Sequence, residues 1–250
     1  MSTLINHRTI STASNSKFFY SLKTLVSSIH KHSNNFIDKI FIYDIGLSQD
    51  ELNEISKWSK CAIIKYPPTF KIEIESRAYK CYARWHATTH SYSSLYVDAG
   101  VMLLQSIENI FEIIEKEHIF LVGDTHLNKD FTHRDCINIM NASDKELNDT
   151  QLSSGVFGHK IGGKYQHIID EAWVFAQNRS CISGNQDNHR HDQSIYSILA
   201  SRYGCKKYDI DTYAYWTDHS RNLNTAIECG ALIFVHRNGH HDFTGLKLSI

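Results

Sequence analysis

The chain has 250 residues, of which 42% are hydrophobic and 21% charged, a composition typical of a folded protein rather than a disordered or fibrous one. Its net charge of -1 argues against bulk electrostatic attraction to nucleic acid or to an anionic membrane. No apolar run approaches the roughly 20 residues that cross a bilayer, and residues 1–8 lack a signal-peptide pattern. We therefore expect no transmembrane segment, no nucleic-acid partner and a cytoplasmic location.

The first hundred residues alternate between short apolar segments and amphipathic ones. Residues 18–32 carry apolar side chains at spacings of three and four, which is typical of a helix. Ser48, followed three residues later by Glu51, predicts a capping box at the start of the next helix. We expect strands at 8–13, 37–43, 61–66 and 94–97, and helices at 18–32, 49–59 and 79–90.

The second half continues the alternation around a polar stretch at 124–148. We expect extended segments at 101–104, 119–122, 151–159 (with a Ser-Ser-Gly turn) and 231–235, and helices at 107–116, 164–178 and 192–203. No linker or repeat interrupts the chain, which predicts a single domain over 1–250. The order of strands and helices predicts an α/β fold with a mostly parallel central sheet, helices on both faces, and ligands beyond the carboxyl ends of the strands.

An acidic residue stands at one of those strand ends. The segment Tyr-Val-Asp-Ala-Gly at 96–100 places Asp98 directly after a buried strand. A carboxylate there costs desolvation energy unless a cation or several hydrogen-bond donors compensate it. Asp98 is therefore either a ligand-binding carboxylate or a cap of the turn, and the residues around it distinguish the two roles.

Two further polar clusters are candidates for chemistry. Asp192 and Gln193 begin a helix after His-Arg-His, so they present a carboxylate and an amide to a polar ligand, unless Asp192 only caps the helix. The tail from His236 and Arg237 to residue 241 sets cations around a glycine after a strand, where they could close over a diphosphate. The alternative for the tail is a frayed polar C-terminus.

Several common enzyme motifs are absent. The sequence contains no GxxxxGK[ST] and no GxGxxG, which argues against a P-loop NTPase and a Rossmann dehydrogenase. It also contains neither GxSxG nor HExxH, the usual marks of α/β hydrolases and zincins.

Five segments, taken in order, resemble nucleotide-sugar-dependent glycosyltransferases of the GT-A fold. They are TISTAS at 9–14, FIYDIGL at 41–47, LYVDAGV at 95–101, QLSSGVF at 151–157 and HDQS at 191–194. The resemblance is nearest to bacterial and large-virus polysaccharide glycosyltransferases, related to chlorovirus rhamnosyltransferase domains. It implies a single GT-A (Rossmann-like) domain in which residues 1–100 bind the nucleotide and residues 101–250 supply the acceptor half and the C-terminal tail.

The resemblance also implies a hexosyltransferase that moves a sugar from a nucleoside-diphosphate sugar, expected to be UDP-linked, to a glycan or polysaccharide acceptor. Expected nucleotide-sugar-binding residues are Ser11, Thr12, Ala13, Asp44, Arg84, His86, Asp98, Ala99, Gly100 and Arg237. Asp192 is the expected catalytic base if the reaction inverts, with Asp135 as second candidate and Gln193 beside it.

Two departures from the family pattern concern the metal. Gly100 replaces the second acid of Asp-x-Asp, so a divalent Mn²⁺ or Mg²⁺ would rest on Asp98, the diphosphate, waters and His236. Arg84 or His86 is expected to replace the lysine that often precedes this motif. The rival class is a non-catalytic sugar- or nucleotide-binding module on the same fold. A nucleotidyltransferase is more distant, because it needs paired metal-binding carboxylates.

Overall fold

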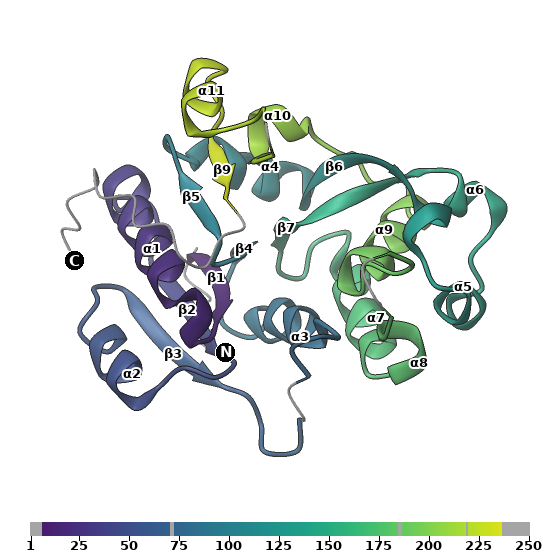
Figure 1. The fold of residues 1–250 in the computed structure, drawn as a ribbon, viewed down its shortest axis with the longest axis horizontal. Helices are drawn as coiled ribbons and strands as arrows, with labels where there is room; N and C mark the ends of the chain where they lie inside the picture. The colour runs from purple at the N-terminus through teal and green to yellow at the C-terminus, as the bar shows by residue number, and fades with distance from the viewer. Residues whose placement is uncertain (1–6, 71–72, 185–186, 219, 237–250) are drawn as a thin grey trace.

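The computed structural model describes residues 7–70, 73–184, 187–218 and 220–236, and a six-stranded sheet runs through their centre (Figure 1). The strand order is β3-β2-β1-β4-β7-β6. Their bounds are β1 Arg8–Ser14, β2 Lys39–Asp44, β3 Cys61–Lys65, β4 Ser93–Val97, β6 Ile119–Leu127 and β7 Thr150–Lys160. The first four pair in parallel and β7 runs antiparallel to β4 and β6, so the predicted mostly parallel α/β sheet is confirmed.

Helices cover both faces of the sheet because its strands carry apolar side chains on both sides. One buried cluster joins Tyr43 and Tyr96 of the sheet to one set of helices, and the other joins Ile10 and Ile42 to a second set. The first set is α3 (Ala78–Ala87), α7 (Gln166–Ala176), α8 (Arg179–Ile182) and α9 (Asp192–Arg202), and the second includes α1 (Phe19–Ser33), α2 (Gln49–Ile55) and α4 (Glu108–Glu117). Alternate side chains along a strand therefore pack on opposite sets of helices, and α3 and α9 lie on the same face of the sheet.

A second, three-stranded sheet brings the end of the described chain back to the turn after β4. It has the order β5-β9-β8, with β5 at Val101–Leu103, β8 at Tyr215–Trp216 and β9 at Ile233–Val235. Just after β9, the backbone N–H of His236 donates to the carbonyl oxygen of Gly100 at 3.0 Å. The strands at 101–104 and 231–235 were predicted, but their pairing was not.

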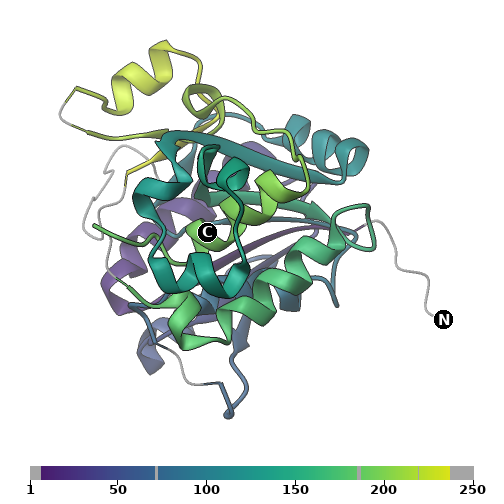
Figure 2. The same cartoon turned by 90° about the vertical axis from the view of Figure 1, so that its right-hand side faces the viewer.

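Several short helices lie in segments that the sequence left unassigned. They are α5 (Arg134–Met140), α6 (Asp144–Leu147), α10 (Ile210–Tyr213) and α11 (Leu223–Glu228), besides α8. Figures 1 and 2 place the yellow α11 at the top of the molecule in both views, away from the green α7 and α8. Within the described residues, no helix is both long and apolar enough to span a membrane.

The start of α2 shows how local sequence fixes an element. The Ser48 side chain accepts a hydrogen bond from the Glu51 backbone N–H, and the Glu51 carboxylate accepts one from the Ser48 N–H at 2.7 Å. Two of the N–H groups left free at a helix start are satisfied in this way. The predicted capping box is confirmed.

Candidate functional site

A cavity of about 410 Å³ opens at the carboxyl ends of β1 and β4. Its walls are the end of β1, residues 98–100 after β4, residues 153–155 of β7, the residues leading into α3, and the start of α9. This is the edge of the sheet where parallel α/β folds bind ligands. The cavity brings Asp98 and Asp192 into one site, although they lie almost a hundred residues apart in sequence.

Asp98 is held at this edge by two donors, the Lys80 ammonium and the Tyr96 hydroxyl. The Nζ of Lys80 lies 2.7 Å from Oδ1 and 2.8 Å from Oδ2, and the Tyr96 hydroxyl donates to Oδ1 at 3.1 Å. Burial raises the pKa of Asp98, but the charge and hydrogen bond of Lys80, together with the charges of Arg84 and Arg77, lower the pKa below the usual value. Burial lowers the pKa of Lys80, and the attraction of Asp98 more than restores it. The pair is therefore a carboxylate and an ammonium at neutral pH.

Gly155 of β7 makes room for that carboxylate. The Asp98 backbone N–H donates to the Gly155 carbonyl oxygen at 2.9 Å, which brings the two segments into contact. A Cβ at position 155 would lie 3.3 Å from Asp98 Oδ2. The Ser-Ser-Gly expected to form a turn is instead part of the continuous strand β7, where the glycine lines the cavity.

Asp192, the first residue of α9, forms the second ion pair of the site. Arg84 Nη1 donates to Asp192 Oδ2 at 3.2 Å, and Nη2 donates to the Ser154 carbonyl oxygen. Both side chains are sealed from solvent, at 0% exposure for Arg84 and 2% for Asp192. The two hydrogen bonds compensate much of the cost of burying the guanidinium.

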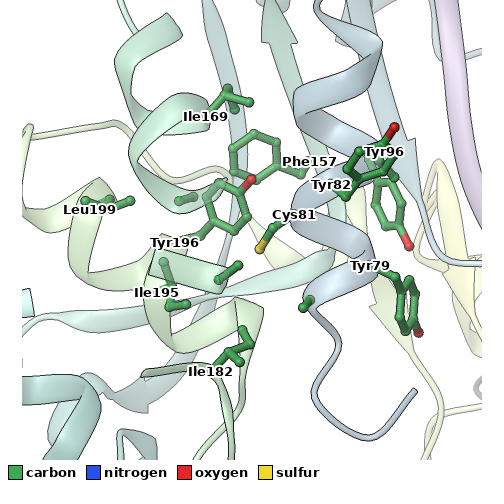
Figure 3. Close-up of a cluster of buried hydrophobic side chains, with 14 of the residues drawn as sticks. Tyr79, Cys81, Tyr82, Tyr96, Phe157, Ile169, Ile182, Ile195, Tyr196 and Leu199 are labelled. Carbon is green, nitrogen blue, oxygen red and sulfur yellow. The ribbon is translucent and has the colours of Figure 1, made fainter. Parts of the chain in front are cut away.

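Aromatic rings complete the surroundings of Arg84. Its guanidinium carbon lies 4.6 Å from the ring centroids of Tyr96 and Tyr196 and 4.8 Å from that of Phe157. Figure 3 shows the rings of Phe157 and Tyr196 side by side in this buried cluster. Such cation–π contacts are stronger when water is excluded, so the rings favour a charged Arg84 here.

The start of α9 is fixed by several further contacts. His191 has φ 55° and ψ -121°, a strained conformation for a residue other than glycine, and its Nδ1 lies 2.9 Å from the Ile182 carbonyl oxygen. Arg190 donates to Asp124 Oδ2 at 2.9 Å. Gln193 Nε2 donates to Gln151 Oε1 at 3.0 Å. These bonds fix the two residues before Asp192 and hold the Gln193 side chain at the cavity wall.

The structure brings some of the predicted residues together and leaves others apart. Those that line the cavity are Ala13, Asp98, Ala99, Gly100, Asp192 and Gln193. Predicted residues outside its described lining are Ser11, Thr12, Asp44, Arg84, His86, Asp135 and His236. Arg237 lies outside the described residues.

The residues outside the lining have other contacts. Asp44 accepts hydrogen bonds from the backbone N–H groups of Gly46 and Leu47, which caps the turn after β2. The Nδ1 of His86 lies 2.9 Å from the Tyr43 hydroxyl. Asp135 is exposed on α5. Ser11 and Thr12 are buried within β1, and His236 is buried beside Gly100. Arg84 is buried and forms an ion pair with Asp192.

Two cations of the site were missed. Neither Arg84 nor His86 contacts Asp98 in place of the expected lysine; Lys80, four residues before Arg84 on α3, does so. The spacing of four residues sets the Lys80 and Arg84 side chains on one helical face. Arg77, just before α3, has φ 60°, lines the cavity and donates to the Tyr79 hydroxyl at 3.3 Å. Burial lowers the pKa of Arg77, but Tyr79 and the two site carboxylates raise it overall.

The donor set does not fit a divalent metal ion. Within the described residues, no three His, Cys, Asp or Glu side chains come together as they would around an ion. Both oxygens of Asp98 are bound by the Lys80 ammonium, and Gly100 provides no second carboxylate. Mn²⁺ and Mg²⁺ favour several oxygen ligands, and a neighbouring cation opposes their binding.

The sheet order, the helices on both faces and the cavity at the strand ends define a GT-A fold. No family model matches the sequence, and no curated protein matches it. Solved structures do match: the WbbM bifunctional glycosyltransferase has 10% identity and a TM-score of 0.62, covering 95% of this chain and 47% of the other. This chain thus spans about half the length of that protein.

Two other solved structures are matched over nearly their whole length. The galactosyltransferase LgtC, solved in complex with donor and acceptor sugar analogs, has 14% identity and a TM-score of 0.59, with 96% of this chain and 92% of the other covered. Mouse xyloside xylosyltransferase 1 has 11% identity and a TM-score of 0.54, with 92% and 97% covered. At these identities the likeness establishes the fold, and the resemblance to chlorovirus rhamnosyltransferase domains stays a prediction.

Proposed function

We propose that this chain is a glycosyltransferase that moves a sugar from a nucleoside-diphosphate sugar, UDP-linked in the first instance, to a hydroxyl of a glycan acceptor. One observation carries the proposal: a single cavity at the carboxyl edge of a GT-A sheet joins Asp98 and Asp192, each paired with a cation of α3. The binding of donor and acceptor sugar analogs by LgtC, which shares the fold, supports this use of the cavity.

The donor side of the proposed site is the β1 and β4 edge. Transfer leaves a nucleoside diphosphate, whose developing negative charge must be stabilised in an oxocarbenium-like transition state. Lys80 and Arg77 present positive charge to the cavity for this purpose. Ala13 at the end of β1 gives the nucleoside a small-residue wall.

The acceptor side is the start of α9. In an inverting reaction, a carboxylate takes the proton of the attacking hydroxyl, and Asp192 is the residue that we assign to this step. Arg84 occupies Oδ2 of Asp192 and fixes its orientation. The Gln193 amide, held by Gln151, would orient the acceptor. A retaining reaction would not need a base of this kind.

Release of nucleoside diphosphate tests the proposal against a non-catalytic binding module. The protein is incubated with a panel of UDP-, GDP- and dTDP-sugars, with and without glycan acceptors. We expect slow release from at least one donor, and loss of release in Asp98→Ala, because Lys80 then loses the carboxylate that positions its ammonium. Tight donor binding without turnover would support the module instead.

A further inference from the structure

We infer that the side-chain cations Lys80 and Arg77 hold the diphosphate of the donor themselves, so that donor binding needs no divalent metal ion. The inference rests on the proposed function and adds to it the way in which the leaving group is bound. Three features of the described residues carry it: the contacts of Asp98, the charge balance of the site and the position of Arg77.

The Asp98 carboxylate already has the partners that a metal ion would replace. The Lys80 ammonium reaches both of its oxygens, at 2.7 and 2.8 Å, and Tyr96 donates to one of them at 3.1 Å. A divalent ion at Asp98 would have to displace these donors or share the carboxylate with an ammonium group. Gly100 stands at the position where the family pattern has its second acid, so this position offers no carboxylate to offset that repulsion.

The charge balance of the site favours an anionic ligand. Three cations, Arg77, Lys80 and Arg84, surround two carboxylates, Asp98 and Asp192, which gives 3 - 2 = +1. Arg190 is paired with Asp124 and leaves this sum unchanged. A surplus of positive charge attracts a diphosphate and repels a divalent cation.

Arg77 supplies the surplus positive charge of this set of residues. Among the described residues its guanidinium forms no ion pair within 4.0 Å, and its side-chain hydrogen bond goes to the Tyr79 hydroxyl. The residue lines the cavity just before α3, three residues from Lys80. A guanidinium can donate two parallel hydrogen bonds to phosphate oxygens, and Lys80 adds a point charge beside it.

Calorimetric titration with UDP tests the inference. The full chain, treated with EDTA, is titrated with UDP, and the titration is repeated with excess Mn²⁺. We expect the two dissociation constants to agree within about threefold, and Arg77→Ala and Lys80→Ala each to weaken metal-free binding about tenfold or more, since charge-assisted hydrogen bonds are lost. Lys116→Ala, at a lysine that is 83% exposed and lies on α4, is the matched control and should bind like the native chain.

The outcomes of this titration separate failure of the inference from failure of the proposed function. UDP binding that appears only with Mn²⁺ would overturn the inference and leave the proposed function standing. Failure of UDP, GDP and dTDP alike to bind below millimolar concentration, with or without metal, would overturn both. Because Lys80→Ala also removes the partner of Asp98, Arg77→Ala tests the cation clamp independently; unchanged affinity in that variant would contradict the role of Arg77.

Discussion

The two ion pairs that α3 forms at the cavity differ in how far they are open to solvent. The side chains of the Lys80–Asp98 pair are 8% and 34% exposed, and those of the Arg84–Asp192 pair are 0% and 2% exposed. Lys80 and Arg84 are one helical turn apart, so one helix supplies both cations. The first pair can exchange contacts with a ligand, whereas the second is part of the packed interior with only its edge at the cavity wall.

This difference in burial has an energetic consequence. An ion pair with access to water contributes little to stability, because water solvates whichever partner is left behind. Loss of one partner from a buried pair leaves an uncompensated charge in the interior and costs much more. The open pair is thus suited to binding a charged ligand, whereas in the sealed pair Arg84 holds the Asp192 carboxylate in one orientation at the start of α9.

The largest expected effect on stability is that of Arg84→Met. The substitution keeps much of the side-chain volume but leaves Asp192 buried without its cation, so we expect the free energy of unfolding to fall by about 3–5 kcal/mol. Urea denaturation followed by circular dichroism measures it, with Lys116→Met as the exposed control. Adding Asp192→Asn to Arg84→Met should recover part of the loss. A loss below about 1 kcal/mol would show that the pair is not sealed.

The next largest effect is a loss of folding stability in acid, which depends on His159, a residue buried in β7 near Arg84. Burial first, and then the positive charge of Arg84, lower the pKa of His159 to about 3. The folded state therefore binds fewer protons than the unfolded state, whose histidine titrates near 6.5. Stability is complete above about pH 6.5 and is lost as the pH falls towards 3, with roughly 2–3 kcal/mol lost at about pH 4.5.

The measurement is unfolding as a function of pH in the native chain and in His159→Gln. The variant should show a flatter fall between about pH 7 and 4.5, with a remaining slope from His189, whose pKa burial lowers to about 4. Lys116→Gln, at a lysine on α4 whose side chain is 83% exposed, is the control and should leave the slope unchanged. An identical slope in the native chain and His159→Gln would contradict the burial of an uncharged His159.

The smallest expected stability effect is at the open pair. Asp98→Ala removes a carboxylate that faces the cavity, and water in the cavity can solvate the Lys80 ammonium, so we expect a loss of about 1 kcal/mol and a melting shift of a few degrees. Thermal unfolding of Asp98→Ala beside Arg84→Met makes the comparison directly. Equal losses in the two variants would remove the distinction between an open and a sealed pair.

The sequence predicted the parts of the fold that depend on local patterns. Apolar spacing gave the parallel strands and main helices, and the Ser48 capping box was confirmed. A second capping box, Ser143 with Glu146, begins α6 inside the polar stretch, and its three-residue spacing is visible in the sequence. The pairing of β9 with β5 depends on contacts far apart in the chain, which no local pattern specifies.

The site was predictable to a similar extent. Asp98 and Asp192 could be found because a strand end and a helix start are visible in the sequence. Lys80 lies within a helix, and its contact with Asp98 depends on how α3 packs against β4, so no single motif points to it. Arg77 is placed by a left-handed backbone conformation that does not follow from its residue type.

The proposed division of the cavity into a donor side and an acceptor side is tested most directly by measuring UDP affinity and donor turnover in Arg77→Ala and Asp192→Asn. Asparagine keeps the size of Asp192 and an acceptor for Arg84 but cannot take a proton. Asp192→Asn should therefore bind UDP within about threefold of the native chain, while transfer falls by ~10² to 10⁴-fold. Arg77→Ala should lose UDP affinity. Equal loss of UDP affinity in both variants, or unchanged transfer in Asp192→Asn, would contradict this division.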